Sequence, residues 1–494
     1  MSSPDTVTEP ARQIPVLHDV DVVVAGSGTA ATIAAIAAAR YGARTLVVDR
    51  FGQLGGNMGP GMWCGGSLHL ALAREPAGDP DESALINRQG MGGIAEEFHR
   101  RVILARPNAG EITPEARAEL EERHLNVAGL RAGTGGGLPG YFTDSIGASQ
   151  VALDMLEEAG ASLLLSAYAA DPLLEGNAVR GLFVETKSGR VAVRARVVID
   201  GTGQAEVAMR AGAPVKKNPA PNLGLWYALG SVDWDRYQDF AAQHQDATPE
   251  DLEWSRRHLA AAETEADPFP DLRHLLPALR RAWEAGEFEF RRHVGAGSIH
   301  IGLRRLGPDM AGGRTGTAGE FDFGEAEVVT RMECEHRRHC YRFARFLRQY
   351  VPGFEASYLM VCSPFLGARG GRYIDAEYPI SREDLEAERQ FDDVIYVYDD
   401  GRAHKRCDVP YRALVPRQVD GLLATGRSAM PYGPNFRVRC NMLLNGQAAG
   451  VAAALATRAG VSPRDLDVKA LQRILVHELS CPLAEEGRLR QLGL

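Results

Sequence analysis

Lysine is scarce in this 494-residue chain, because only five lysines occur and arginine supplies nearly all of the 55 positive charges. The net charge is −9 and no basic tail or stripe is present, which argues against nucleic acid as the main partner. No apolar run is long enough to span a bilayer. The N-terminal segment has early acidic residues and no apolar core, so we expect no signal peptide and a cytoplasmic location.

Cysteine pairs with the spacing of metal or redox motifs are also lacking. None of the seven cysteines shows CxxC spacing, which argues against zinc ribbons, c-type haem attachment and dithiol motifs of that kind. Cys334 and Cys340 lie in one expected helix, and we interpret them as free thiols in a reducing compartment. His336 and His339 share a face of this helix with Cys340, but no fourth ligand accompanies them, so we predict no metal site.

The remaining composition is that of an ordinary globular enzyme, with 45% hydrophobic and 24% charged residues. At about 150 residues per domain, the length corresponds to roughly three domains' worth of mass. A core of that size needs no disulfides.

The strongest pattern lies near the N-terminus, where residues 22–25 are typical of a buried parallel strand. An alanine-rich helix is expected over residues 29–41, and a second strand over residues 45–48. The sequence GSGTAA between the first strand and the helix is a GxGxxG fingerprint with alanine in its last position. This order predicts a dinucleotide-binding unit.

Each residue type of the fingerprint suits the binding of a dinucleotide for a physical reason. Gly26 permits the tight turn, and Gly28 lets backbone N–H groups approach a pyrophosphate at the positive end of the helix. Ala31 lets the helix pack closely on the strand. Asp49 closes the second strand and is placed to accept hydrogen bonds from a ribose hydroxyl.

Other segments show the same pattern of an apolar strand that ends in a glycine turn. A hairpin is expected from residues 179–185 and 191–199, and it runs into a buried strand that ends in the DGTG turn at 200–203. Near the C-terminus, residues 421–424 read as a strand that closes on a glycine turn, and a small-residue helix is expected to open at Gly446 and Gln447. The first N–H groups of that helix would point at whatever lies before it.

These patterns, in their order along the chain, resemble the FAD-dependent oxidoreductases related to the succinate dehydrogenase/fumarate reductase flavoprotein. The resemblance covers residues 21–214 and 350–456. It implies an α/β fold: a Rossmann-like FAD-binding domain of the glutathione-reductase type, split into residues 15–217 and 354–494, with an inserted α+β cap or substrate domain at 218–353. FAD is expected to bind non-covalently, because no histidine or cysteine lies in a linkage motif.

The resemblance assigns one set of residues to the cofactor and another to catalysis. Those assigned to FAD are Gly26, Gly28, Ala31, Asp49, Arg50, Gly55, Gly56, Asp200, Gly203, Gly426, Arg427, Gly446 and Gln447. Those considered for catalysis are Arg369, Arg437, Arg372, His300 and Tyr373. Five arginines could clamp a substrate carboxylate or could instead pair with buried acids or backbone carbonyls: Arg369, Arg372, Arg412, Arg437 and Arg439. We expect the structural role for about three of them, and Arg437 and Arg369 are the best candidates for a site role.

The chain departs from the family pattern at two places. Gln204 stands where the family has an acidic residue after the DGTG-like turn. Gly370 and Gly371 replace an acid and a hydroxyl in a segment that usually reads G-x-R-E-[ST]-R-R. His300 could be an ordinary half-buried histidine, and Tyr373 could simply pack.

The resemblance implies hydride transfer between flavin N5 and a small, anionic organic substrate, with an unknown electron acceptor or donor. Two alternatives remain open: an oxidase that uses O₂, and a flavin-carrying electron-transfer subunit without a substrate of its own. A hydroxylating monooxygenase is less favoured, because Thr425, Gly426 and Arg427 stand where those enzymes carry a Gly-Asp pair. A homo-oligomer is possible.

Overall fold

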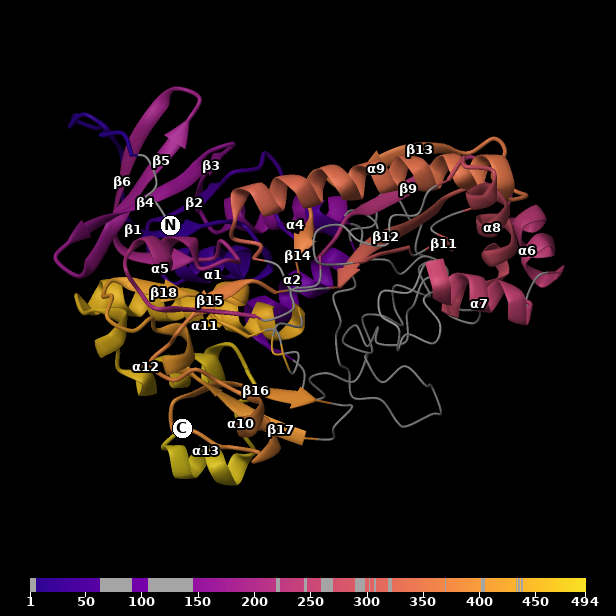
Figure 1. Ribbon diagram of the computed structural model, residues 1–494. Coiled ribbons are helices and arrows are strands. Elements are labelled where there is room, and N and C mark those ends of the chain that lie inside the picture. Colours follow the sequence, from indigo (N-terminus) through magenta and orange to yellow (C-terminus); the bar gives the residue numbers. More distant parts are fainter. Residues whose placement is uncertain are drawn as a thin grey trace.

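The chain forms two β-sheet bodies with separate hydrophobic cores, drawn on the left and right of Figure 1. The computed structural model describes residues 6–62, 91–104, 145–218, 223–243, 247–258, 270–288, 298–301, 303–305, 308–318, 322–368, 370–400, 405–431, 433, 436 and 439–494. The N-terminal and C-terminal parts of the chain share the first body, and the residues between them build the second.

The first sheet has seven strands in the order β3–β2–β1–β6–β5–β4, with β18 paired to β6. Strands β3, β2, β1, β6 and β18 are parallel, and β5 and β4 continue the sheet antiparallel. Their bounds are β1 Val16–Ala25, β2 Thr45–Asp49, β3 Ser162–Leu165, β4 Tyr168–Glu175, β5 Ala178–Thr186, β6 Gly189–Asp200 and β18 Leu422–Ala424. The expected first two strands and the hairpin are confirmed.

Helices cover this sheet: α1 (Thr29–Arg40), α2 (Gly93–Leu104), α4 (Ser145–Glu158) and α11 (Arg439–Ala459). Helices α1 and α11 pack through their smallest residues, because a Cβ on Gly446 or Gly450 would collide with the backbone carbonyl of Ala30 or Ala34. The expectation that a helix opens at Gly446 was wrong. The residues before it are good helix formers, so α11 begins at Arg439, and the glycine marks a close helix contact instead.

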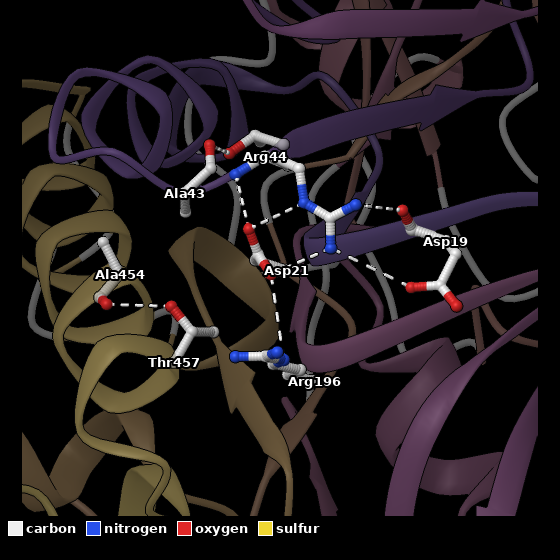
Figure 2. Close-up of polar contacts among 8 residues, drawn as sticks. Asp19, Asp21, Ala43, Arg44, Arg196, Ala454 and Thr457 are labelled. Carbon is white, nitrogen blue, oxygen red and sulfur yellow. Dashed lines mark hydrogen bonds and ion pairs between the residues drawn. The ribbon is translucent and has the colours of Figure 1, made fainter.

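Ion pairs fix the parallel strands at the end away from the fingerprint turn (Figure 2). Arg44, just before β2, donates from its backbone N–H and from Nε to Asp21 Oδ2 of β1, at 2.9 and 3.1 Å. Arg196 of β6 lies 3.8 Å from the other carboxylate oxygen of Asp21. One carboxylate therefore joins all three strands.

The second sheet has the order β13–β9–β12–β8–β14, with β10 and β11 also on β12, and all of its pairs are antiparallel. Its strands are β8 Leu223–Gly224, β9 Trp226–Gly230, β10 Ser298–Ile301, β11 Arg304–Arg305, β12 Ala311–Ala318, β13 Tyr358–Cys362 and β14 Gly367–Ala368. Its helices are α6 Trp234–Gln243, α7 Pro249–His258, α8 Leu276–Glu284 and α9 Ala326–Tyr350. Two of these strands follow the boundary expected at residue 353, so the second body extends to Ala368.

The two chain crossings between the bodies lie side by side, because β7 (Val215–Lys217) pairs antiparallel with β15 (Arg372–Ile374). The rest of the first body carries the two-stranded sheet β16 (Val394–Asp400) and β17 (Lys405–Pro410). Its short helices are α5 Glu206–Arg210, α10 Arg382–Glu386, α12 Val468–Arg473 and α13 Glu486–Leu492. None of the helices in the described ranges is long and apolar enough to cross a membrane.

Candidate functional site

The candidate site lies at the carboxyl ends of β1, β6 and β18, where three glycine-containing turns meet. Gly26 has a φ of +96°, and a Cβ there would lie 2.7 Å from the carbonyl oxygen of Gly201. Gly203 has a φ of +79°, and a Cβ there would lie 2.6 Å from Nη2 of Arg427. Ligands of open α/β sheets bind at such carboxyl ends.

A second glycine loop, after β2, closes on the fingerprint turn. Gly28 and Gly55 form a parallel β-bridge, and the Gly55 N–H donates to Ser27 O at 2.9 Å. A Cβ on Gly56 would lie 3.0 Å from the Gly28 Cα. The backbone of the 55–56 loop therefore lies directly against the fingerprint.

This cradle fits the pyrophosphate of a dinucleotide. Among the described residues, a Cβ on Gly28 would meet only one atom within 4 Å, the Gly201 oxygen at 3.9 Å, so this part of the chain leaves the space beside Gly28 open. Gly28 is also the N-cap of α1, with no side-chain capping bond and no acidic residue in the first helical turn. The first N–H groups of α1 are therefore available to an anion.

Asp49 lies at the base of the cradle and is buried. Its Oδ2 accepts hydrogen bonds from the backbone N–H and the hydroxyl of Ser27, both at 2.6 Å, and its Oδ1 accepts from the N–H of Phe51 at 2.8 Å. The side chain therefore braces both glycine loops, a role that the sequence did not indicate. Its expected contact with a ribose stays a prediction.

Asp200 has a similar internal role, and its expected contact with FAD stays a prediction. Its fully buried carboxylate accepts from Thr202 Oγ1 at 2.7 Å, from Ala208 N at 2.9 Å and from Ser428 Oγ at 3.0 Å. Ser428 in turn accepts from the N–H of Gly203 at 2.9 Å. Ser428 was not predicted, and it joins the turns after β6 and β18.

The second body borders this cradle. The ring of Phe51 stacks on that of Phe365 with centroids 4.2 Å apart, and Asn57 Nδ2 donates to Ala368 O at 2.9 Å. Arg427 Nη1 also donates to the Ala368 carbonyl. Arg50 is exposed and lies over the Phe51 ring, 5.0 Å from its centroid. We call this contact region between the two bodies the seam. Arg427 holds its guanidinium there by a hydrogen bond, beside the glycine turns.

The predicted catalytic residues are only partly brought together. Arg372 Nη2 pairs with Glu325 at 2.9 Å and Asp322 at 3.4 Å, so its charge is matched by carboxylates, and the structural alternative fits it better than a substrate clamp. Tyr373 follows it in β15, half-buried, and burial, aided by Asp375, raises the pKa of its hydroxyl. A tyrosine is protonated at neutral pH even at its ordinary pKa, and the raised pKa makes this hydroxyl a weaker acid.

The other catalytic candidates are less informative. Arg369 and Arg437 lie outside the described residues. The backbone of His300 lies in β10 opposite Gly316 of β12. No cluster of three potential metal ligands occurs among the residues described.

Helix α11 contributes an unexpected polar group. Asn441, in its first turn, is fully buried, and neither atom of its carboxamide has a hydrogen-bond partner among the described residues. Asn445 lies one turn later on the same face, and its Oδ1 accepts from Gly426 N at 2.8 Å and Thr425 Oγ1 at 2.7 Å. In the sequence, two asparagines four residues apart in an apolar run would have indicated two polar side chains on one helix face. This pattern was not recognised, because the helix was expected to begin only at Gly446.

Gly446 and Gln447 lie about two turns into α11, so the argument from free helical N–H groups does not apply to them. The buried Gln447 side chain accepts from Ala95 N of α2 at 3.0 Å and donates to Cys481 Sγ at 2.8 Å. Its side chain therefore joins α11 to α2 and to the C-terminal segment.

Comparisons with known proteins agree with a flavin site. The family model described as FAD dependent oxidoreductase matches residues 21–475. No curated protein matches the chain. Solved structures that resemble it include a geranylgeranyl bacteriochlorophyll reductase-like protein from Thermoplasma acidophilum (15% identity, 94% of this chain and 84% of that chain, TM-score 0.39). Another is the OxyS anhydrotetracycline hydroxylase from Streptomyces rimosus (13% identity, 92% of this chain and 65% of that chain, TM-score 0.39).

At these identities and TM-scores, no property of either protein is transferred to this chain. The family match spans most of the sequence, and both the fingerprint turn and the open space beside Gly28 fall within it. The chain therefore belongs to the FAD-dependent oxidoreductase family and is an enzyme whose cofactor is FAD.

Proposed function

We propose that this enzyme transfers a hydride between FAD and a small, anionic organic substrate, as a relative of the succinate dehydrogenase/fumarate reductase flavoprotein. When bound, FAD supplies a ring that accepts or donates a hydride at N5. The protein binds the cofactor, orients the substrate and excludes water. The direction of the reaction and the electron partner are left to experiment.

The observation that carries this proposal is the seam between the two bodies. Phe365 and Ala368 of the second body contact Phe51, Asn57 and Arg427 of the first, beside the glycine turns. A substrate held there lies next to the cofactor and under the second body, which serves as the cap in this proposal. The Arg427 guanidinium places positive charge at the same seam, and such charge favours an anionic substrate.

The proposal also gives roles to residues of the cradle. The N–H groups after Gly28 hold the pyrophosphate, and Asp49 keeps the two glycine loops in the geometry that this requires. The carboxamide of Asn441, which has no partner among the described residues, hydrogen-bonds to the bound FAD in this proposal, because a buried polar group costs free energy when it stays unpaired. Tyr373 is the candidate proton donor, because its half-buried hydroxyl is protonated at neutral pH.

The test is anaerobic titration of the purified holoprotein with matched pairs of small carboxylates and their neutral amides. We expect a carboxylate to bleach the flavin absorbance and its amide to bleach it far more slowly. An added chemical reductant shows that the flavin can be reduced. If this reductant bleaches the flavin and no carboxylate does, the proposal that the enzyme dehydrogenates an anionic substrate is wrong. Equal bleaching by acid and amide would contradict the anionic part alone.

Admission of air to the bleached protein separates the two reaction types. Rapid recovery of the absorbance with formation of hydrogen peroxide would indicate the oxidase alternative. Slow recovery in air, but fast recovery with an added electron acceptor or an unsaturated product analogue, is what we expect for a dehydrogenase or reductase.

A further inference from the structure

Two cysteines of the second body lie against each other, far apart in sequence and outside the cofactor cradle. Cys340 is fully buried in α9, and Cys362 is the half-buried last residue of β13, the edge strand of the second sheet. Cys362 packs against the hydrophobic cluster to which Cys340 belongs, and the two thiols interact with each other. No spacing motif in the sequence reveals this pair.

The backbone around the two thiols is held in place from both sides. Arg337, almost one helical turn before Cys340, donates from Nη1 to Ser363 O at 3.1 Å and from Nη2 to Pro364 O at 2.7 Å. On the other side, Tyr227 lies opposite Cys362 in the sheet, and its ring packs edge-on against Phe343 of α9 with centroids 6.1 Å apart. The helix and the strand end therefore stay together in the reduced protein.

The surroundings of Cys362 favour thiol chemistry. Its interaction with Cys340 is the main cause that lowers the pKa of the Cys362 thiol; partial burial opposes this effect, and the positive charge of Arg337 adds to it. A thiol with a lowered pKa, partial exposure and a neighbouring second thiol has the features of a reactive cysteine with a resolving partner. The buried Cys340 is suited to the second role.

We propose that Cys340 and Cys362 form a redox-active thiol pair that a low-molecular-weight disulfide converts into an intramolecular disulfide. The Cys362 thiolate attacks one sulfur of the reagent, forms a mixed disulfide and releases one thiol. The Cys340 thiol then loses its proton and attacks Cys362 Sγ, which forms the Cys340–Cys362 bond and releases the second thiol. Two cysteines are oxidised and one disulfide molecule is reduced to two thiols, so the exchange balances.

The bond would act on the segment that borders the cofactor. Strand β13 leads directly into Phe365 and Ala368, which contact Phe51, Asn57 and Arg427. Oxidation would thus tie this segment covalently to α9. The pair needs no hydride transfer at the flavin, so it is independent of the proposed reaction.

The test treats the FAD-loaded, full-length protein with oxidised glutathione, then denatures and alkylates it before peptide mapping by mass spectrometry. We expect the alkylated forms of the Cys340 and Cys362 peptides to be lost together. They should appear as one cross-linked pair that dithiothreitol separates. This wild-type map decides the proposal without any variant.

Variants assign the order of attack. In Cys340→Ala we expect a glutathione adduct to persist on Cys362, because the resolving thiol is absent. Cys334→Ala, which removes an exposed cysteine of the same helix, should leave the cross-link unchanged. The proposal is overturned if Cys334 is glutathionylated while both Cys340 and Cys362 remain alkylatable, or if either one cross-links to a different cysteine.

Discussion

The side chain of Gln204 lies against the backbone of Gly371, whose positive φ is one that residues with a side chain rarely adopt. Gln204 Oε1 accepts from the N–H of Arg372 at 3.0 Å, and its Nε2 donates to Gly370 O at 3.3 Å. Gly371 has a φ of +143°, and a Cβ there would collide with the Gln204 carboxamide. The two departures from the family pattern, Gln204 and the Gly370–Gly371 pair, therefore contact each other: the neutral Gln204 amide hydrogen-bonds to the backbone around the glycines.

We expect Gly371→Ala to destabilise the protein by at least about 2 kcal/mol, because strained backbone and overpacking each cost on the order of 1–3 kcal/mol. Urea unfolding measures this change. Adding Gln204→Ala should recover only the steric part, since the backbone strain remains.

Gly487→Ala is the matched control. Gly487 lies in α13, and no atom of the residues that the structure places lies within 4 Å of a Cβ built on it outside its own helical turn, so its replacement should be neutral or slightly stabilising. Equal stability of Gly371→Ala and wild type would show that the segment can relax around the new methyl group.

The first sheet was predictable because its signals are local. The apolar runs of β1 and β2, the glycine fingerprint and the hairpin turn each lie within a few residues. The contacts of Asp49, Asp200 and Gln204 could not be predicted, because each carboxylate or carboxamide reaches a loop that only the tertiary fold brings near. For the same reason the sequence did not indicate that β13 joins the second sheet: it pairs with a strand more than a hundred residues away, Trp226–Gly230.

Asp49→Asn should weaken FAD binding and lower the free energy of unfolding of the apoprotein, each by about 1–3 kcal/mol. The amide would set an NH₂ group against one of the N–H donors of Ser27 or Phe51, so a loop would lose its brace. FAD titration and urea unfolding of the apoprotein measure the two effects. A loss of FAD affinity with unchanged apoprotein stability would instead favour a direct ribose contact.

Ser27→Ala provides the comparison for this brace. It removes only the hydroxyl donor to Asp49 and leaves both backbone donors in place. Its effect on both measurements should therefore be smaller than that of Asp49→Asn.

The buried histidines of α9 predict a loss of stability in mild acid. Burial lowers the pKa of His336 from its ordinary value of 6.5 to about 4. The ring is held by a contact of 2.5 Å between its Nδ1 and Thr315 Oγ1. Between these values the unfolded chain binds a proton that the folded protein does not, so the free energy of unfolding decreases as the pH falls. One histidine contributes about 1.4 kcal/mol per pH unit in this range.

Urea unfolding between pH 7 and about pH 4 tests this slope. His336→Gln cannot gain the proton, so its stability should depend less on pH than that of the wild type. His477→Gln changes an exposed histidine and should keep the wild-type slope. The same slope in all three proteins would mean that His336 is protonated in the folded state.

The last prediction concerns Asn441, whose carboxamide is buried without a partner among the described residues, one turn from the Asn445 that holds Gly426. If it bonds to FAD, Asn441→Leu should raise the Kd for FAD about tenfold, which corresponds to about 1.4 kcal/mol. The same change should leave the apoprotein equally stable or more stable, because an unpaired amide is replaced by an apolar group of similar size. Asn445→Leu should instead destabilise the apoprotein, since it leaves the Gly426 N–H unpaired. Titration of FAD onto both apoproteins, with urea unfolding of each, separates the two roles. An unchanged Kd in Asn441→Leu would show that the carboxamide does not contact the cofactor.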